Sequence, residues 1–504
     1  MVGEISRERL EKAPSEVYSD TILAPGYHFQ LGHYFTPIVE TNKAWTVMLL
    51  DAGIIDDATA SGLAGAISDL EAAGPESIAE FDPTYEYFYS HVERYLSDRA
   101  GEEVGGEINI GRTRPEPLAR LVVRSGLLGV AESLTALREI LLDVSDAEAE
   151  TVMPLCTHMQ HAQVATFGHY MVGVARVLER DHTRIMAAFR TTNVSTLGCG
   201  ALAGSSYPLD RDLVAALLGF DGFRENANDC VASGDWLQEV VAAVANMMIA
   251  LSRMCQDLYI WHTREHRYME IGDEFSGSSS MMPQKKNPYP FEYVRGMAAR
   301  VVGDMSSTFG ALHNVNFQDT KDVEEEIVYP GLRVLDEASR ALTLLVGTMQ
   351  TLVVHRDTMA ARAMDDYAWA TELAAVIHRK TPGLSYRQAH RVVGHLVLKA
   401  VQSGLEVSAI DSDLVNEAGR AVLDRELDFT AEDLDSILDP LALVSAHATP
   451  GGTAPLEVRR AVQDGRATLA SHADELQAVR ESLRHAHDQL QARISGLVAV
   501  DGDA

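Results

Sequence analysis

The stretch WLQEVVAAVANMMIAL, residues 236–251, shows most clearly how this chain folds. Its apolar residues recur at steps of three and four, which places them on one face of a helix: Trp236, Leu237, Val240, Val241, Val244, Met248 and Leu251. Similar stretches follow along most of the sequence, whereas the alternation typical of strands is scarce. Because 46% of the residues are hydrophobic and only 7% aromatic, the sequence predicts an all-α protein packed through Ala, Leu and Val.

Proline and glycine clusters divide the 504 residues into three blocks. A chain of this length exceeds one ordinary core, so we expect three domains. They are an N-terminal domain of helices and loops at 1–112, a central helical bundle at 113–366 and a C-terminal helical domain at 367–504.

Leucine recurs every seven residues near the end of the chain, at Leu469, Leu476, Leu483, Leu490 and Leu497. A leucine zipper is one interpretation of this spacing. Because His472, Arg493 and Gly496 interrupt the companion positions, we favour ordinary packing on the neighbouring helices.

Charge and cysteine content limit the function classes. The formal net charge of −31 would repel a nucleic-acid backbone, so small metabolites are the expected partners. The Lys285–Lys286 pair and Arg112 with Arg114 can still make one site locally cationic. Four scattered cysteines without a CxxC pair fit a reducing cytoplasm. The first residues lack the apolar stretch of a secretory signal, and the apolar run 240–251 is too short to span a bilayer, so we expect no membrane segment.

The segment GDEFSGSSSMMPQKKNP, residues 272–288, stands out between two helical stretches. Its small and hydroxylated residues allow backbone freedom and close approach to a ligand. Lys285 adds a cation and Asn287 an amide. Taken alone, this pattern is as typical of a solvated linker as of a mobile catalytic loop.

Several motifs resemble one family. SSSMMPQKKNP is similar to the GSSxMPxKxNP signature of the fumarase and aspartase superfamily, and its QKKNP ending resembles the argininosuccinate lyase branch. The stretch 156–181, CTHMQHAQVATFGHYMVGVARVLERD, resembles the family's THLQxAQPxTFGH helix. LGCGALAGSSYPLDR, residues 197–211, resembles its LGSGALAGTTFPIDR. The resemblance spans residues 34–462.

The resemblance implies a three-domain all-α fold with a long central bundle. It further implies a homotetramer with a twenty-helix core, in which each active site takes segments from three chains. The implied reaction is a reversible anti elimination that converts an N-substituted aspartate into fumarate and an amine. No metal or organic cofactor is implied.

The same resemblance assigns the reaction to named residues. Ser279 matches the general base, and Lys285 and Asn287 match the residues that hold the reacting carboxylate. Removing a weakly acidic proton next to a carboxylate needs both a base and a cation that stabilises the doubly negative intermediate. A serine is normally too weak a base, so a closed, water-poor site must activate Ser279.

The remaining site residues divide between the two halves of the substrate. For the fumarate half, Thr113 and Arg114 match the Ser-Arg of the family's GRSRND motif, and Thr157 can hydrogen-bond a carboxylate. His158 is suited to protonating the departing nitrogen, since histidine titrates near neutral pH. Gln318 and Lys321, in HNVNFQDTK, match residues that contact the leaving amino acid.

Without the family match, His158, His161 and His169 would be interpreted as structural histidines on one helix. A zinc site is a poorer interpretation, because neither an HExxH pattern nor a nearby cysteine pair completes it.

Some positions depart from the family pattern. They are Ser278 for glycine, Pro115 for asparagine, Gly234 for arginine, His313 for tyrosine and Asn42 for a substrate-binding serine. These departures leave two substrates open, argininosuccinate or a different N-(aminoalkyl) or N-(carboxyalkyl) aspartate. A non-catalytic, crystallin-like structural protein is the alternative from another class, and the retained Ser279, Lys285, Asn287 and His158 argue against it.

Overall fold

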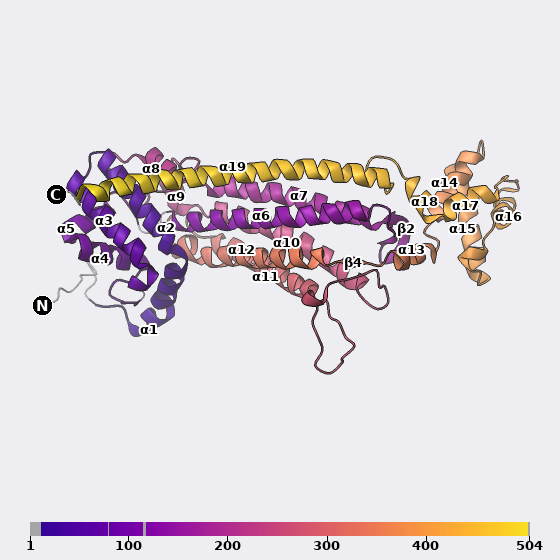
Figure 1. Ribbon diagram of the computed structural model, residues 1–504, viewed down its shortest axis with the longest axis horizontal. Coiled ribbons are helices and arrows are strands. Elements are labelled where there is room, and N and C mark those ends of the chain that lie inside the picture. The colour runs from indigo at the N-terminus through magenta and orange to yellow at the C-terminus, as the bar shows by residue number, and fades with distance from the viewer. Residues whose placement is uncertain (1–11, 79, 114–116, 502–504) are drawn as a thin grey trace.

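The structure is a computed structural model that describes residues 12–78, 80–113 and 117–501. The molecule is elongated and almost entirely helical, with an N-terminal group of helices at one end, a long bundle in the middle and a C-terminal group at the other end (Figure 1). The all-α prediction is therefore confirmed.

The N-terminal group has its own hydrophobic core, in which Trp45, Leu63 and Phe88 are fully or almost fully buried. Its helices are α1 (Glu16–Tyr18), α2 (Ala24–Asp51), α3 (Asp57–Ala73), α4 (Phe88–Ala100) and α5 (Glu102–Gly105). A π-helical turn, η1 (Ser19–Leu23), joins α1 to α2, and short 3-10 turns follow α3 and α5 as η2 (Pro75–Ile78) and η3 (Gly106–Asn109).

The central bundle contains the largest hydrophobic core among the described residues. Its helices are α6 (Leu118–Ala147), α7 (Phe167–Thr192), α10 (Asp235–Trp261), α11 (Tyr289–Leu312) and α12 (Val328–Gln350). α10 packs between α7, α11 and α12, and α6 packs on α7 and α12. The short helices α8 (Arg211–Leu217) and α9 (Ala227–Ala232) lie in the connection from α7 to α10.

By length and composition alone, α10 could cross a membrane. However, 56% of its most apolar window is buried within the protein, and its neighbours are the other bundle helices. The apolar face that its sequence predicted is thus the centre of the bundle core.

The C-terminal group is a set of short helices around Trp369, Val392 and Leu434. They are α13 (Arg356–Met364), α14 (Ala370–Lys380), α15 (Tyr386–Gln402), α16 (Ser412–Leu423), α17 (Ala431–Leu438) and α18 (Pro440–Ser445), with the 3-10 turn η6 (Val407–Ala409) before α16.

The last helix, α19 (Pro455–Asp501), leaves this group and runs back along the bundle to the N-terminal helices (Figure 1). It packs on α6, α7 and α3. Leu476 is buried in the core of the bundle, and Leu469 and Leu483 pack against that core. Leu490 is buried in the N-terminal core, and Leu497 packs against it. The prediction that these leucines pack on neighbouring helices, rather than in a leucine zipper, is confirmed. The domain boundaries at 112 and 366 stay a prediction.

One predicted helix is wrong in its first part. Residues 152–166 form an antiparallel hairpin of β1 (Val152–Thr157) and β2 (Gln160–Thr166). His158 and Met159 make its turn, and both have the positive φ of a type I′ turn, 55° and 61°. β-Branched residues and a proline favour extended strands over a helix here. The helix starts only at Phe167, where Thr166 caps α7 by accepting the backbone N–H of His169 at 3.0 Å.

Candidate active site

The segment 272–288 projects from the end of the bundle where α10 ends and α11 begins (Figure 1). β3 (Met269–Glu270) precedes it and pairs with β4 (Val353–Val354), which follows α12. The 3-10 turn η4 (Asp273–Phe275) then leads into the loop. The loop is thus attached to two bundle helices at its base.

Asn287 closes the base of this loop. Its backbone exchanges two hydrogen bonds with Gly277, at 2.8 and 2.9 Å, and its buried side-chain amide donates to the Gly277 carbonyl at 3.0 Å. Tyr289 packs so tightly on Gly277 that a side chain at this position would overlap its ring. The amide predicted to hold a substrate carboxylate therefore supports the loop in this structure.

Ser279 and Lys285 lie beyond this closure. The Ser279 hydroxyl accepts the backbone N–H of Met282 at 3.0 Å, which fixes the turn that carries it. Lys285 is exposed, whereas Lys286 is paired with Asp273 at 2.9 Å. Of the two lysines, Lys285 is the one whose ammonium faces solvent and is available to a ligand.

Thr157 and His158 are exposed at the tip of the β1–β2 hairpin. The hairpin is anchored at its base by buried Glu148, which accepts two hydrogen bonds from Arg356, at 2.6 and 2.8 Å. Thr151 donates to the same carboxylate at 2.5 Å. Because the base of the hairpin is held firmly and its tip is exposed, Thr157 and His158 are positioned to contact a molecule that approaches from outside.

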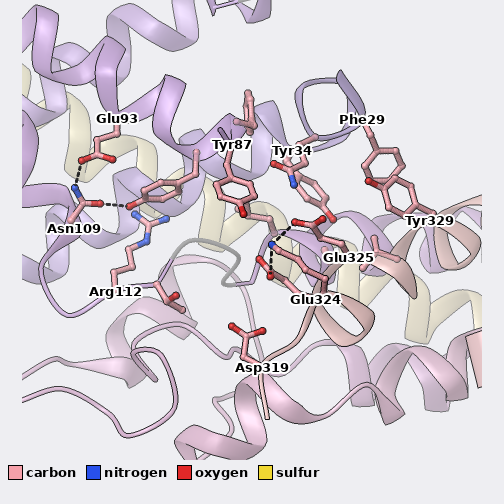
Figure 2. A pocket seen from close by; sticks show the side chains of 18 residues that line it. Phe29, Tyr34, Tyr87, Glu93, Asn109, Arg112, Asp319, Glu324, Glu325 and Tyr329 are labelled. Atoms are coloured by element: carbon pink, nitrogen blue, oxygen red, sulfur yellow. Dashed lines mark hydrogen bonds and ion pairs between the residues drawn. The ribbon is translucent and has the colours of Figure 1, made fainter. Parts of the chain in front are cut away.

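At the opposite end of the bundle, an open cavity of about 590 Å³ contains two of the predicted site residues, Thr113 and Lys321. Its walls come from α2, α4, the start of α6, the π-helical turn η5 (Asp322–Glu326) and α12 (Figure 2). Gln318 is exposed three residues before Lys321, and Arg114 lies outside the described residues.

Arg112 supplies a cation on one side of this cavity. Its Nη1 donates to Asn42 at 2.6 Å, and its guanidinium lies over the Tyr89 ring at 5.4 Å. The Nε and Nη2 atoms are buried and have no hydrogen-bond partner among the described residues. Unpaired, buried N–H groups of an arginine are costly unless an acceptor such as a carboxylate arrives.

Carboxyl groups gather on the other side of the cavity. Lys321 donates to Glu324 at 2.8 Å and to Glu325 at 2.6 Å, and its ammonium lies 4.7 Å from the Tyr87 ring centre. Burial opposes a charged Lys321, but the two glutamates raise its pKa overall. Burial raises the pKa of Glu324 and of Asp319, although Lys321 acts in the opposite direction on both.

The predicted site residues do not meet within one chain. α6, with 30 residues at about 1.5 Å each, places about 45 Å between the Thr113 end and the hairpin end. α11, with 24 residues, likewise places about 36 Å between the Ser279 loop and the segment that contains Gln318 and Lys321.

Part of the cavity wall is not predicted by the sequence motifs. Tyr34, Tyr329, Glu324 and Glu325 line the cavity but lie outside every motif described above. The only sequence signal for the two glutamates was the acidic run 322–326 directly after Lys321. Arg112 was noted for its charge alone.

The structure shows the surroundings of two positions that depart from the family pattern, Gly234 and Ser278. A side chain on Gly234, at the start of α10, would meet the end of the Leu312 side chain at 2.6 Å, so an arginine here would require Leu312 to move. Ser278 does not have the positive φ that favours glycine. His313 is exposed at the end of α11, and Pro115 lies outside the described residues.

Comparison with known proteins defines the class. The family description "lyase" matches residues 60–303, and "argininosuccinate lyase C-terminal" matches residues 367–445. The chain is 33% identical to argininosuccinate lyase 1 of Shouchella clausii, over 96% of this chain and 97% of that protein. It is 36% identical to argininosuccinate lyase of Methanoculleus marisnigri, over 83% and 84%. The structure of EDDS lyase in complex with formate matches with a TM-score of 0.86 at 28% identity, over 97% of each chain.

These matches and the helical fold define a lyase of the fumarase/aspartase superfamily. Within it, the chain belongs to the argininosuccinate lyase family. It is a carbon–nitrogen lyase that eliminates fumarate from an N-substituted aspartate, as its sequence predicted.

Proposed function

We propose that the elimination takes place at sites shared between the chains of a homotetramer. The observation that supports this proposal is the separation, by helices about 36 to 45 Å long, of residues that must act on one small substrate. Two bundles packed side by side in antiparallel orientation would bring the loop end of one chain next to the cavity end of another. Exposed apolar residues on α10 and α11 favour such packing: Ile249, Tyr289, Tyr293 and Phe309.

In the proposed reaction, Ser279 removes the proton from the carbon next to the reacting carboxylate. Lys285 stabilises the doubly negative intermediate, which keeps the barrier low only in a site from which water is excluded. The loop closed at Gly277 and Asn287 can present both groups to a neighbouring chain.

His158 gives a proton to the departing nitrogen, and Thr157 hydrogen-bonds a carboxylate of the substrate. The second carboxylate of the aspartyl half binds at Thr113 and Arg114, next to the unpaired N–H groups of Arg112. Gln318 and Lys321 face the amine half.

Two candidate substrates, which differ in the leaving amine, are proposed. The relatives are named for argininosuccinate, which makes it the first substrate to test. The departures at Gly234, Ser278, His313 and Pro115 support a different N-substituted aspartate as the second. The cysteines are scattered and form no disulfide among the described residues, which supports a reducing cytoplasm as the location.

The activity is tested by the ultraviolet absorbance of fumarate released from argininosuccinate and from a panel of N-substituted aspartates. We expect release from at least one substrate and its loss in Ser279→Ala. Purified, folded protein that releases fumarate from none of them would contradict the proposal.

Shared sites are tested by mixing two inactive variants, Ser279→Ala and Lys321→Met, unfolding them together and refolding them. Mixed tetramers contain some sites with neither substitution, so activity should return, whereas each variant refolded alone stays inactive. No recovery in the mixture, or a fully active monomer in sedimentation, would contradict sites shared between chains.

A further inference from the structure

We infer that the leaving amine carries a second positive charge, and that Asp319, Glu324 and Glu325 select it. The inference rests on the proposed function, because it takes the cavity as the part of the active site that holds an aspartyl carboxylate at Thr113 and the amine at Lys321.

The amine side of the cavity has an excess of carboxyl groups. Asp319, Glu324 and Glu325 stand against one ammonium group, that of Lys321 (Figure 2). Lys321 is already bound by both glutamates, at 2.8 and 2.6 Å. Within the described part of the chain, the Asp319 carboxylate forms neither a hydrogen bond nor an ion pair. A ligand carboxylate would therefore compete with two glutamates for one cation.

The aromatic side chains around these carboxyl groups strengthen their attraction for a cation. Phe29, Tyr34, Tyr87 and Tyr329 line the same side of the cavity, so aromatic rings stand beside these carboxyl groups. Burial raises the pKa of Tyr34, and Tyr329, Glu325 and Glu324 add to the effect. Charges interact more strongly where water is displaced, and aromatic faces themselves attract cations.

The other side of the cavity has the opposite character. Arg112 offers two buried N–H groups without a partner next to Thr113. Glu93 also lines this side, but its carboxylate accepts a hydrogen bond from Asn109 at 2.7 Å. The cavity thus presents unpaired donors at one side and three carboxyl groups at the other. A substrate with a dicarboxylate at one end and a protonated nitrogen at the far end of its amine tail complements both sides, whereas a carboxylate on the tail would be repelled.

The test compares three substrates of equal tail length: N-(aminopropyl)aspartate, N-(carboxypropyl)aspartate and N-butylaspartate, each with its group at the chain end. Fumarate release gives kcat/KM for each. We expect the aminopropyl compound to exceed the carboxypropyl compound by at least about tenfold, with the butyl compound between them.

The same ratio is then measured in Glu325→Gln and Asp319→Asn, which remove one charge each at almost constant shape. Either variant should lower the aminopropyl to carboxypropyl ratio by about tenfold. Glu326→Gln, the same change one residue away and outside the cavity wall, is the control and should lower the ratio much less than the two cavity variants. Because a ratio cancels the fraction of active protein, partial unfolding cannot imitate the result.

Equal kcat/KM for the charged substrates in the unsubstituted enzyme, or a ratio that stays constant in both cavity variants, would overturn the inference and leave the proposed function standing. Absence of fumarate from every substrate, argininosuccinate included, would instead overturn the proposed function, and the inference with it.

Discussion

The Nη1 atom of Arg112 donates a 2.6 Å hydrogen bond to the Oδ1 atom of Asn42, 70 positions away in the sequence. Asn42 is buried in α2. The hydrogen bond turns the guanidinium so that its other N–H groups remain unpaired. One buried amide thereby sets the direction of a cation that lines the cavity.

Replacing Asn42 by leucine should therefore loosen Arg112 and weaken substrate binding. A hydrogen bond to a charged group contributes about 1.5–3 kcal/mol, so KM should rise by about tenfold or more, with a smaller change in kcat. Asn42→Asp keeps the acceptor and should restore KM in large part. Steady-state kinetics on fumarate release measures both, and an unchanged KM in the leucine variant would show that Arg112 needs no such support.

Gly277→Ala should impair the loop without unfolding the protein. Its methyl group would overlap the Tyr289 ring at the point where Asn287 closes the loop. A displacement of catalytic groups by about 1 Å can cost about a hundredfold in rate, so kcat should fall by at least tenfold. Gly65→Ala, in α3, meets open space and serves as the control. Equal kcat in both variants would contradict the role of the loop base.

Gly168 should prove essential to the contact between α6 and α7. A side chain there would collide with the backbone of Ser145 and Ala149, which cannot move aside as a flexible side chain can. Overpacking of this kind costs about 1–3 kcal/mol, so Gly168→Ala should lower the unfolding midpoint. Gly173→Ala, one and a half turns further along α7, meets nothing and should be neutral or slightly stabilising. Denaturant unfolding of the two variants in parallel measures the two midpoints, and equal midpoints would contradict the prediction.

A buried histidine should make the folded state sensitive to acid. His182 on α7 stacks on His472 of α19, with ring centres 4.0 Å apart. Burial, together with His472 and Arg138, lowers the pKa of His182 to about 3. Arg138 donates to His472 at 2.8 Å and to Glu179 at 3.2 Å, so the surroundings of the pair hold both signs of charge.

The direction of the effect follows from the two pKa values. Unfolded His182 takes up a proton near pH 6.5, but the folded protein keeps it neutral down to about pH 3. Its contribution to stability is thus complete above pH 6.5 and is lost as the pH falls toward 3, by at most about 1.4 kcal/mol per pH unit.

His182→Phe keeps a stacking ring but cannot titrate. The difference between its free energy of unfolding and that of the unsubstituted protein should change between pH 7 and pH 5, in favour of the variant at pH 5. Denaturant unfolding at the two pH values measures it. A constant difference would mean that His182 is protonated in the folded state as easily as in the unfolded one.

Local patterns in the sequence were enough to predict the helical fold, the lyase family and the reaction. The spacing of Val240, Val244 and Leu251 depends only on helix geometry, and a motif such as SSSMMPQKKNP keeps its chemistry in a short stretch of chain. The heptad leucines could also be weighed correctly, because the residues that interrupt them are visible in the sequence.

Only the tertiary structure decided how these parts act together. The helix expected around His158 is a hairpin, because Glu148, Arg356 and the turn at His158–Met159 hold the chain extended. The partners of Arg112 and Lys321, and the distance of Ser279 from both, depend on packing between segments far apart in the sequence. Burial and charge pairing arise from that packing, and no local pattern contains them.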